Sequence, residues 1–230
     1  MSDNQERYLI VNADDFGSRV GVNRAIARAH DTGIVTSASL LVRRPLAKEA
    51  AALARSRPKL SVGLHVDLGE WAYDKSRGWT PRYELPTPDA ASVEHEVLAQ
   101  LEDFRILIGD DPTHLDSHQH VHNREPAKSA LGGIADALGL PLRHRSPVRY
   151  CGEFYGLSKE ERPLPELVTV AALIKIVTAL PAGYTELCCH PDDERDSAAE
   201  VDVLCDPRVQ VALRGAGVKL RSFRDWLDSA

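Results

Sequence analysis

The chain has 230 residues, with 28 basic and 34 acidic side chains, and its formal net charge is −6 when histidine is neutral. Because 43% of the residues are hydrophobic and 27% are charged, the chain can bury a core, which excludes a disordered or low-complexity protein. The acidic excess argues against a nucleic-acid partner, which needs clustered Lys and Arg. We expect a single domain over residues 1–230.

The cysteines and the amino-terminal segment bear on the cellular compartment. Cys151, Cys188, Cys189 and Cys205 lack the paired spacing of a zinc ribbon or a disulfide framework. The polar first seven residues do not resemble a signal peptide, and no apolar stretch reaches the roughly 20 residues of a membrane span. We therefore expect reduced thiols, no membrane span and a cytoplasmic protein.

Short runs typical of buried strands alternate along the chain with segments of helical period. Strands are predicted at 8–12, 36–42, 60–66, 113–117, 141–144, 184–189 and 218–222. Helices are predicted at 22–33, 46–56, 90–108, 127–138, 165–180, 203–214 and 223–228. This alternation implies parallel strands in an α/β fold, either a doubly wound open sheet or a TIM-like barrel. In both, functional residues gather where strands end and helices begin.

Neither a dinucleotide-binding nor a P-loop motif follows the first strand. The connection 70–89 lacks clear periodicity and holds four aromatic residues, Trp71, Tyr73, Trp79 and Tyr83. Long functional loops belong on the active face of such folds, so we expect this loop to lie there.

Two adjacent carboxylates, Asp14 and Asp15, end the first strand. At a turn into a helix both can reach one pocket, one as a metal ligand and the other as a base. The simpler interpretation is that one of them caps the following helix, but Ser18 is already available as a cap.

Histidines mark three further predicted strands. His65 interrupts an apolar run, and alone such a residue is more often a hydrogen-bonded core histidine. His190 follows the strand at 184–189. Strand alternation places five residues of the segment 114–122 on one side for as long as it stays extended: His114, Asp116, His118, His120 and His122.

Imidazoles with a carboxylate are the ligand set of hydrolytic metal sites, where three protein ligands leave a position for water and substrate. Not all four of the clustered histidines can bind one ion, and Asp116 fits a carboxylate that orients an imidazole. A histidine-rich surface loop is the alternative.

Other polar residues carry weaker signals. Arg143, with Arg145 and Arg149, is either solvated or binds an anionic group or a carboxylate. Nothing near Cys188 or Cys189 in the sequence indicates a nucleophilic thiol.

Taken together, these segments resemble the YdjC family of carbohydrate deacetylases, which includes chitooligosaccharide deacetylases and hopanoid-associated relatives. The matching phrases are LIVNADDFG at 9–17, GIVTSASLLV at 33–42, VGLHVDL at 62–68, PTHLDSHQHVH at 112–122, FYG at 154–156, CHP at 189–191 and GVKLRSFRDW at 217–226. They cover nearly the whole chain, and the combination of NADDFG with HLDSHQHVH is specific.

The resemblance implies a TIM-barrel-like (β/α) barrel, here with seven strands, one divalent metal ion and hydrolysis of an acetamido group. It places Asp15, His65 and His118 as metal ligands, Asp14 as the base and His190 as the acid. Supporting or substrate-facing roles fall to His114, Asp116, His120, His122, Arg143 and Tyr155, whereas His30, His95 and His144 need no catalytic explanation.

Several features of the reaction stay open. The ligand set suggests Zn²⁺, whereas the resemblance favours Mg²⁺. The aromatic residues of the loop, Trp71, Tyr73, Trp79 and Tyr83, have two interpretations. They stack on a sugar ring, or they pack within the loop or against a second subunit, as in a homodimer. The expected substrate is an N-acetylated sugar, such as an oligosaccharide or glycolipid that contains N-acetylglucosamine. The alternatives are another metal-dependent hydrolase, such as a phosphoesterase, and a non-catalytic sugar-binding relative.

Overall fold

The computed structural model describes residues 6–158, 160, 162–193 and 198–229. The described residues form a seven-stranded sheet with the order β6-β3-β2-β1-β8-β7, in which β9 also pairs with β1. Every pairing of this sheet is parallel. Its strands are β1 (Arg7–Phe16), β2 (Ser37–Leu40), β3 (Ser61–Val66), β6 (Leu115–Ser117), β7 (Arg149–Cys151), β8 (Gly183–Cys189) and β9 (Val218–Leu220).

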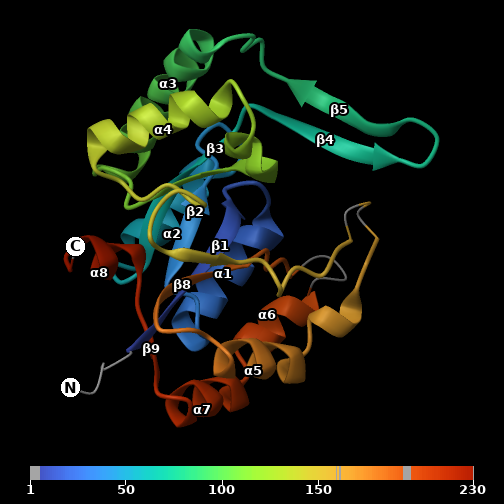
Figure 1. Cartoon of the computed structure of the whole chain (residues 1–230), viewed down its shortest axis with the longest axis vertical. Coiled ribbons are helices and arrows are strands. Elements are labelled where there is room, and N and C mark those ends of the chain that lie inside the picture. The colour runs from blue at the N-terminus through green and yellow to red at the C-terminus, as the bar shows by residue number, and fades with distance from the viewer. Residues whose placement is uncertain (1–5, 159, 161, 194–197, 230) are drawn as a thin grey trace.

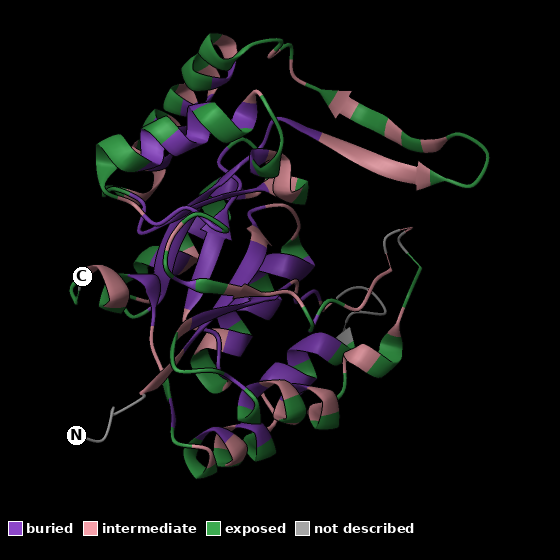
Figure 2. Cartoon of the chain, viewed as in Figure 1, coloured by how far each residue is buried: buried purple, intermediate pink, exposed green. Residues whose placement is uncertain are grey.

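Helices cover this sheet and make its central strands almost wholly buried (Figure 2). They are α1 (Val20–Thr32), α2 (Ala47–Arg55), α3 (Ala90–Ile108), α4 (Ala127–Leu138), α5 (Val170–Thr178), α6 (Ala198–Leu204), α7 (Pro207–Gly215) and α8 (Phe223–Leu227). Helices α3 and α4 pack together at one end of the sheet, and α5, α6 and α7 lie at the other end (Figure 1). In the part of the chain that is described, no helix combines the length and apolarity that crossing a membrane requires.

The predicted α/β class with parallel strands is confirmed, but a closed seven-stranded barrel is not. Strands β6 and β7 stand at opposite ends of the strand order, and within the described ranges no pairing joins them. The strand predicted at 141–144 is wrong, because Leu142 makes only an isolated bridge to Leu115. His144 has a φ of 64°, which interrupts an extended backbone, and the strand of this region is instead β7.

The segment 70–89 is not the irregular loop that its sequence suggests. Strands β4 (Gly69–Asp74) and β5 (Gly78–Glu84) form an antiparallel hairpin that projects from the body of the protein (Figure 1). At its turn the Asp74 carboxylate accepts hydrogen bonds from the backbone of Ser76 at 2.8 Å and of Arg77 at 3.0 Å. Most hairpin residues are partly or fully exposed, so no alternation of polar and apolar residues marks these strands.

Two predicted helices are shorter or divided because of their capping residues. The helix predicted at 165–180 is a single 3-10 turn (Pro165–Leu167) followed by α5. Thr169 caps α5, because its side chain accepts a hydrogen bond from Ala172 N at 3.1 Å. The helix predicted at 203–214 is divided into α6 and α7. Asp206 caps α7 and Pro207 occupies its first turn, a combination that starts a new helix.

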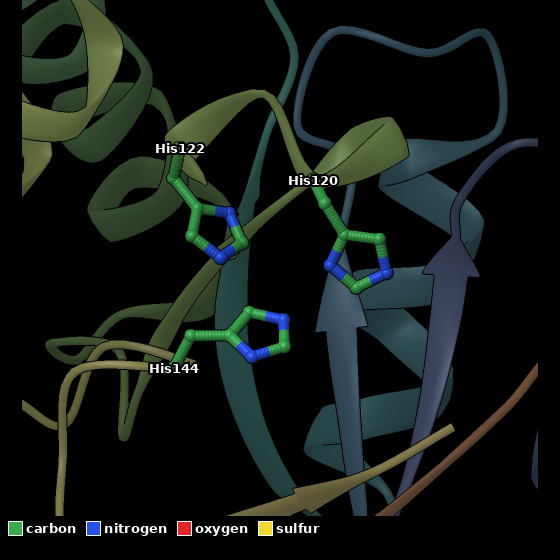
Figure 3. Close-up of side chains that lie close together, drawn as sticks. All are labelled: His120, His122 and His144. Carbon is green, nitrogen blue, oxygen red and sulfur yellow. The ribbon is translucent and has the colours of Figure 1, made fainter. Parts of the chain in front are cut away.

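The histidine-rich segment leaves the sheet in its middle. Strand β6 ends at Ser117, and the 3-10 turn His118–Asn123 follows, in which Gln119 and His120 have φ angles of 50° and 54°. The predicted alternation therefore extends only to Ser117. Beyond it, the rings of His120 and His122 turn toward His144 instead of continuing the line of the strand (Figure 3).

Candidate active site and metal centre

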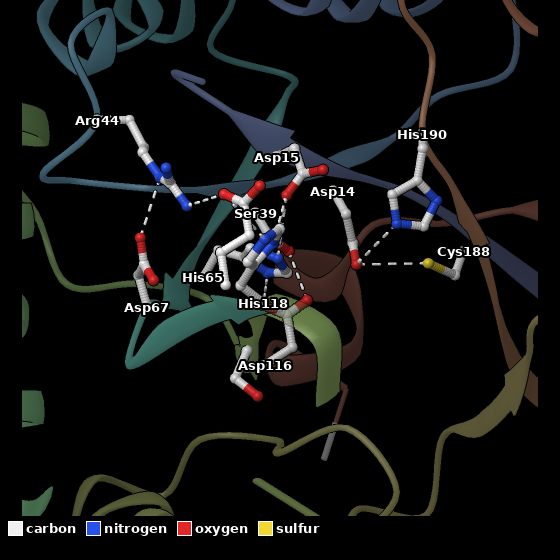
Figure 4. Close-up of polar contacts among 12 residues, drawn as sticks. Asp14, Asp15, Ser39, Arg44, His65, Asp67, Asp116, His118, Cys188 and His190 are labelled. Carbon is white, nitrogen blue, oxygen red and sulfur yellow. Dashed lines mark hydrogen bonds and ion pairs between the residues drawn. The ribbon is translucent and has the colours of Figure 1, made fainter. Parts of the chain in front are cut away.

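An irregularity at the end of β1 brings both aspartates to one site. Consecutive strand residues normally face opposite sides of a sheet. The pairing of β1 with β2 shifts register between Ala13 and Phe16, and Asp15 has a φ of 64° in the left-handed region. This local turn brings both carboxylates to the carboxyl edge of the sheet, with Asp15 beside the imidazoles of His65 and His118 and Asp14 facing Cys188 and His190 (Figure 4).

Asp15, His65 and His118, which we call the first cluster, gather at this edge. The Asp15 Oδ1 atom lies 3.0 Å from His118 Nδ1 and 3.5 Å from His65 Nε2, and one ligand atom from each residue lies within 4.8 Å of the others. Burial raises the pKa of Asp15, but the imidazoles of His118 and His65 together outweigh burial, so the pKa is well below its usual range. One carboxylate and two imidazoles leave a position for water on a tetrahedral ion.

Asp116 orients His65 within the first cluster. His65 Nδ1 donates a hydrogen bond to Asp116 Oδ1 at 2.7 Å, which leaves Nε2 directed at Asp15. The Ser39 hydroxyl donates to Asp116 Oδ2 at 2.6 Å and fixes the carboxylate in turn. Carboxylate support of the second ring nitrogen is the arrangement found behind metal-bound histidines, where it fixes the tautomer and raises ligand basicity.

Arg143 binds carboxylates and is not solvated, whereas the sequence leaves both alternatives open. The residue is 4% exposed, and its guanidinium donates to both oxygens of Asp14 at 2.7 and 2.8 Å and to Glu186 Oε1 at 2.6 Å. It also lies 2.8 Å from Asp116 Oδ2. Burial raises the pKa of Asp14, but Arg143 outweighs it and lowers the value to about 2. For Glu186 burial dominates, and its pKa rises to about 7.

The charge balance of this edge fits a cation. Three carboxyl groups contact the Arg143 guanidinium, namely Asp14, Asp116 and Glu186, and a fourth, Asp15, lies beside the imidazoles of His65 and His118. Burial lowers the pKa of His65, but Asp116 and Asp14 outweigh it and raise the value well above its usual range. The same negative field that favours a proton there favours a divalent ion, and the donor set of the first cluster suits one.

His190 lies on the other side of Asp14. Its Nε2 atom is 3.8 Å from Asp14 Oδ2, and its backbone N–H donates to Glu200 Oε1 at 2.6 Å. Burial lowers the pKa of His190. The exposed ring of Tyr155 stands edge-on to this imidazole with 4.8 Å between ring centroids. Asp14 therefore stands between the first cluster and a second titratable group.

The cysteines near this edge are free. Cys188 Sγ donates to Asp14 Oδ2 at 3.4 Å, and burial raises the pKa of its thiol well above the usual range. Burial likewise raises the pKa of the Cys189 thiol. Both groups are protonated thiols at neutral pH, which agrees with the expectation that neither is a nucleophile.

His114 takes no direct part in the first cluster. It is buried, stacks on Phe223 with 3.9 Å between ring centroids, and contacts Ser39 through Nε2 at 3.0 Å. A Cβ atom at Gly63 would lie 2.4 Å from the His114 ring, so only glycine permits this packing. His114 thus reaches the site only through Ser39, the residue that holds Asp116.

The hairpin is attached to the site at its base. The Gln119 side chain accepts from Trp71 N at 2.9 Å and donates to Trp71 O at 2.7 Å, and Glu70 Oε2 lies 3.9 Å from His118 Nε2. Near the hairpin tip Tyr73 and the half-exposed Trp79 form an edge-to-face pair with 5.8 Å between ring centroids.

Register places Trp71, Tyr73 and Trp79 on one hairpin face, so three of the four predicted aromatic residues stay together. Tyr83 does not join them, because its hydroxyl donates to both oxygens of Asp67 at 2.5 and 2.6 Å.

Sequence reasoning missed Glu186, Ser39 and Glu70. Glu186 carried a usable signal, since a charged residue within the apolar strand β8 calls for a buried partner, just as His65 does within β3. Ser39 and Glu70 carried none, because serine and an exposed-looking glutamate are ordinary residues at these positions.

The fold and the site together define an α/β protein with a carboxylate–imidazole cluster at the carboxyl edge of a parallel sheet. The family model for YdjC-like proteins matches residues 8–215. The chain therefore belongs to the YdjC-like family, as the sequence predicts.

Curated relatives and solved structures agree with this family. A carbohydrate deacetylase of Geobacillus stearothermophilus is 34% identical over 96% of this chain and 98% of its own length. A chitooligosaccharide deacetylase of Klebsiella pneumoniae (strain 342) is 32% identical over 96% of this chain and 99% of its own length.

Two solved structures show the same fold. One is a protein of Enterococcus faecalis V583 whose suggested role is cellobiose-phosphate cleavage, with a TM-score of 0.76, 23% identity and coverage of 96% of this chain and 99% of that one. The other is a family 4 carbohydrate esterase from Streptomyces lividans in complex with acetate, with a TM-score of 0.57, 15% identity and coverage of 93% and 91%.

Proposed function

We propose that the protein is a metal-dependent deacetylase that hydrolyses the N-acetyl group of an amino sugar to acetate and the free amine. The observation that carries the proposal is the position of Asp14, which lies between the first cluster and His190. The names of the curated relatives support the substrate class.

Asp15, His65 and His118 would hold the ion, with Asp116 fixing the orientation of His65. A divalent ion bound there supplies Lewis-acid chemistry, which polarises the acetyl carbonyl and lowers the pKa of water. The sequence favours Zn²⁺ through its imidazoles, whereas the family resemblance favours Mg²⁺.

Asp14 and His190 would divide the proton transfers. With a pKa of about 2, Asp14 is ionised at neutral pH and can accept a proton from the attacking water. Arg143 holds both of its oxygens and so fixes the direction from which it accepts. Burial lowers the pKa of His190, and the negative charge of Asp14, 3.8 Å from His190 Nε2, opposes that lowering; it would therefore favour the protonated imidazole that donates to the leaving amine as the C–N bond breaks.

The hairpin would form one wall of the sugar site. The apolar face of a sugar ring stacks on aromatic rings, and Trp71, Tyr73 and Trp79 share a hairpin face whose base contacts Gln119, next to His118. Tyr155 beside His190 would contact the sugar from the opposite side of the reacting bond.

Acetate release from a series of N-acetylated sugars, from N-acetylglucosamine to chitooligosaccharides, tests the proposal. We expect the metal-loaded protein to release acetate, a chelator to stop it, and Zn²⁺ or Mg²⁺ to restore it. His95→Ala changes an exposed residue of α3 that belongs to none of the candidate metal-binding groups, so it serves as the control and should behave like the wild type. In the same assay Trp79→Ala should raise KM more for oligosaccharides than for the monosaccharide.

Two outcomes would contradict the proposal. Metal-dependent phosphate release from esters without acetate release would support the phosphoesterase alternative. Sugar binding without metal-dependent turnover on any member of the series would support a non-catalytic relative.

A further inference from the structure

Three histidines outside the first cluster converge beside it. His120 and His122 come from the 3-10 turn after β6, and His144 follows the isolated bridge at Leu142; we call these three residues the second cluster. Their rings turn toward a common centre (Figure 3). One nitrogen from each lies within 4.8 Å of the other two.

The spacing of these rings is that of imidazoles around one ion. The ring centroids are separated by 5.8 Å between His120 and His122, 5.4 Å between His120 and His144, and 5.6 Å between His122 and His144. Zinc–nitrogen bonds of about 2.0–2.1 Å at tetrahedral angles place the centroids of three histidine ligands about 5.2 Å apart. Small ring rotations would close the difference, and His144 is the exposed member of the three.

The rings of the buried His122 and the half-buried His120 each have one nitrogen in a hydrogen bond and one nitrogen without a partner. His122 is 3% exposed, and its Nδ1 lies 2.5 Å from Ser117 Oγ. In His120 it is Nε2 that lies 3.3 Å from the Tyr150 hydroxyl. The remaining nitrogens, His122 Nε2 and His120 Nδ1, are buried and make no hydrogen bond among the described residues. Buried polar atoms are rarely left unpaired, so these two point to a missing ligand.

The second cluster is separate from the first. The other candidate groups of metal-binding side chains in the described chain all contain Asp14 or members of the first cluster, whereas this one shares no residue with them. It also contains no carboxylate. Three imidazoles favour a transition ion such as Zn²⁺ and disfavour Mg²⁺ or Ca²⁺, which prefer oxygen ligands.

We propose that His120, His122 and His144 form a second metal site, which binds Zn²⁺ or a similar transition ion through three imidazole nitrogens. Water would complete the tetrahedral coordination. Ser117 and Tyr150 would hold the nitrogens of His122 and His120 that do not bind the ion, as hydrogen-bonding partners do behind metal-bound histidines. The site does not depend on the proposed function.

Zinc stoichiometry tests this proposal directly. Tag-free, metal-free protein would be titrated with Zn²⁺ and the bound metal measured by elemental analysis after dialysis. We expect two equivalents for the wild type and for the control His95→Ala, and one for His144→Asn. Asparagine tolerates the φ of 64° at this exposed position, so the variant should fold. Because losing an outer partner alone weakens metal affinity 10–100-fold, losing a ligand should weaken this site by more than about 100-fold.

Two further variants separate the sites. His118→Ala should also bind one equivalent, and the double variant His118→Ala/His144→Asn none. His122→Gln should reproduce the loss seen in His144→Asn. Unchanged zinc stoichiometry and affinity in both His144→Asn and His122→Gln would overturn the second site. Because zinc is measured directly, a protein without deacetylase activity could still show the His144-dependent equivalent.

Discussion

The two histidine clusters differ in what supports them. In the first cluster a buried carboxylate, Asp116, holds His65, and a third ligand, Asp15, is itself an acid. In the second cluster the supports of His122 and His120 are the neutral hydroxyls of Ser117 and Tyr150. Both clusters lie near Arg143, whose positive charge opposes protonation of His120 and His122. The neighbouring groups, and not the imidazoles themselves, therefore set the charge and the ligand preference of each cluster.

The charge around each cluster determines which role we expect it to have. The first cluster lies in a negative field that attracts protons and hard or borderline divalent ions, and it adjoins Asp14 and His190, the proposed base and acid. In the second cluster burial lowers the pKa of His120 to about 4 and that of His122 to about 3, so these imidazoles are neutral at pH 7. We expect the first cluster to perform the chemistry and the second to hold an ion without an acid–base pair.

The largest expected effect comes from Asp14→Asn. A positioned acid or base contributes about 10²–10⁴-fold to rate, so kcat for acetate release should fall by that factor. Zinc stoichiometry should stay at the wild-type value, because Asp14 belongs to neither cluster. Full activity in this variant would remove Asp14 from the role of base, and loss of bound metal would instead make it a ligand.

Asp116→Asn should have the next largest effect and should act on one cluster only. Loss of the carboxylate behind His65 should weaken metal affinity in the first cluster by about 10–100-fold. Affinity in the second cluster, measured in the His118→Ala background with and without this substitution, should change little. Equal weakening of both sites would indicate general destabilisation, which thermal unfolding of the metal-free protein would reveal.

Ser117→Ala is the matched change for the second cluster and should have the smallest effect. A neutral hydroxyl supports His122 less strongly than a carboxylate supports His65, so zinc affinity there should fall by about 10-fold at most. Zinc titration of the wild type and the variant, each in the His118→Ala background, measures it. A loss as large as that caused by Asp116→Asn would show that the charge of the supporting group is not what separates the two clusters.

Much of the fold follows from local sequence signals. The strands β1, β3 and β8 are long apolar runs, and α3 and α4 end at glycines in the left-handed conformation, so their positions were predictable. The hairpin β4–β5 and the strand β7 were not. Both are exposed or short, and their pairing depends on partners that the local pattern does not reveal.

The candidate site shows the same division. Asp14, Asp15, His65, His118 and His190 each follow or interrupt an apolar strand, and in a parallel sheet such positions meet at one edge. The roles that the family resemblance gives them remain predictions. His144, by contrast, ended a predicted strand that the structure does not form, and it joins His120 and His122 because the chain turns after Ser117 and again after Arg143.

The sequence by itself determined the α/β class, the family and the edge at which the polar residues collect, because periodicity and strand-end position are local properties. Only the tertiary contacts show that β6 and β7 end the strand order, that Arg143 binds Asp14 instead of solvent, and that five of the nine histidines form two separate clusters. Local patterns do not reveal these features, because positive φ angles at Asp15, His120 and His144 redirect the side chains at the sheet edge. Only the packed chain, with its buried charges paired, stabilises those conformations.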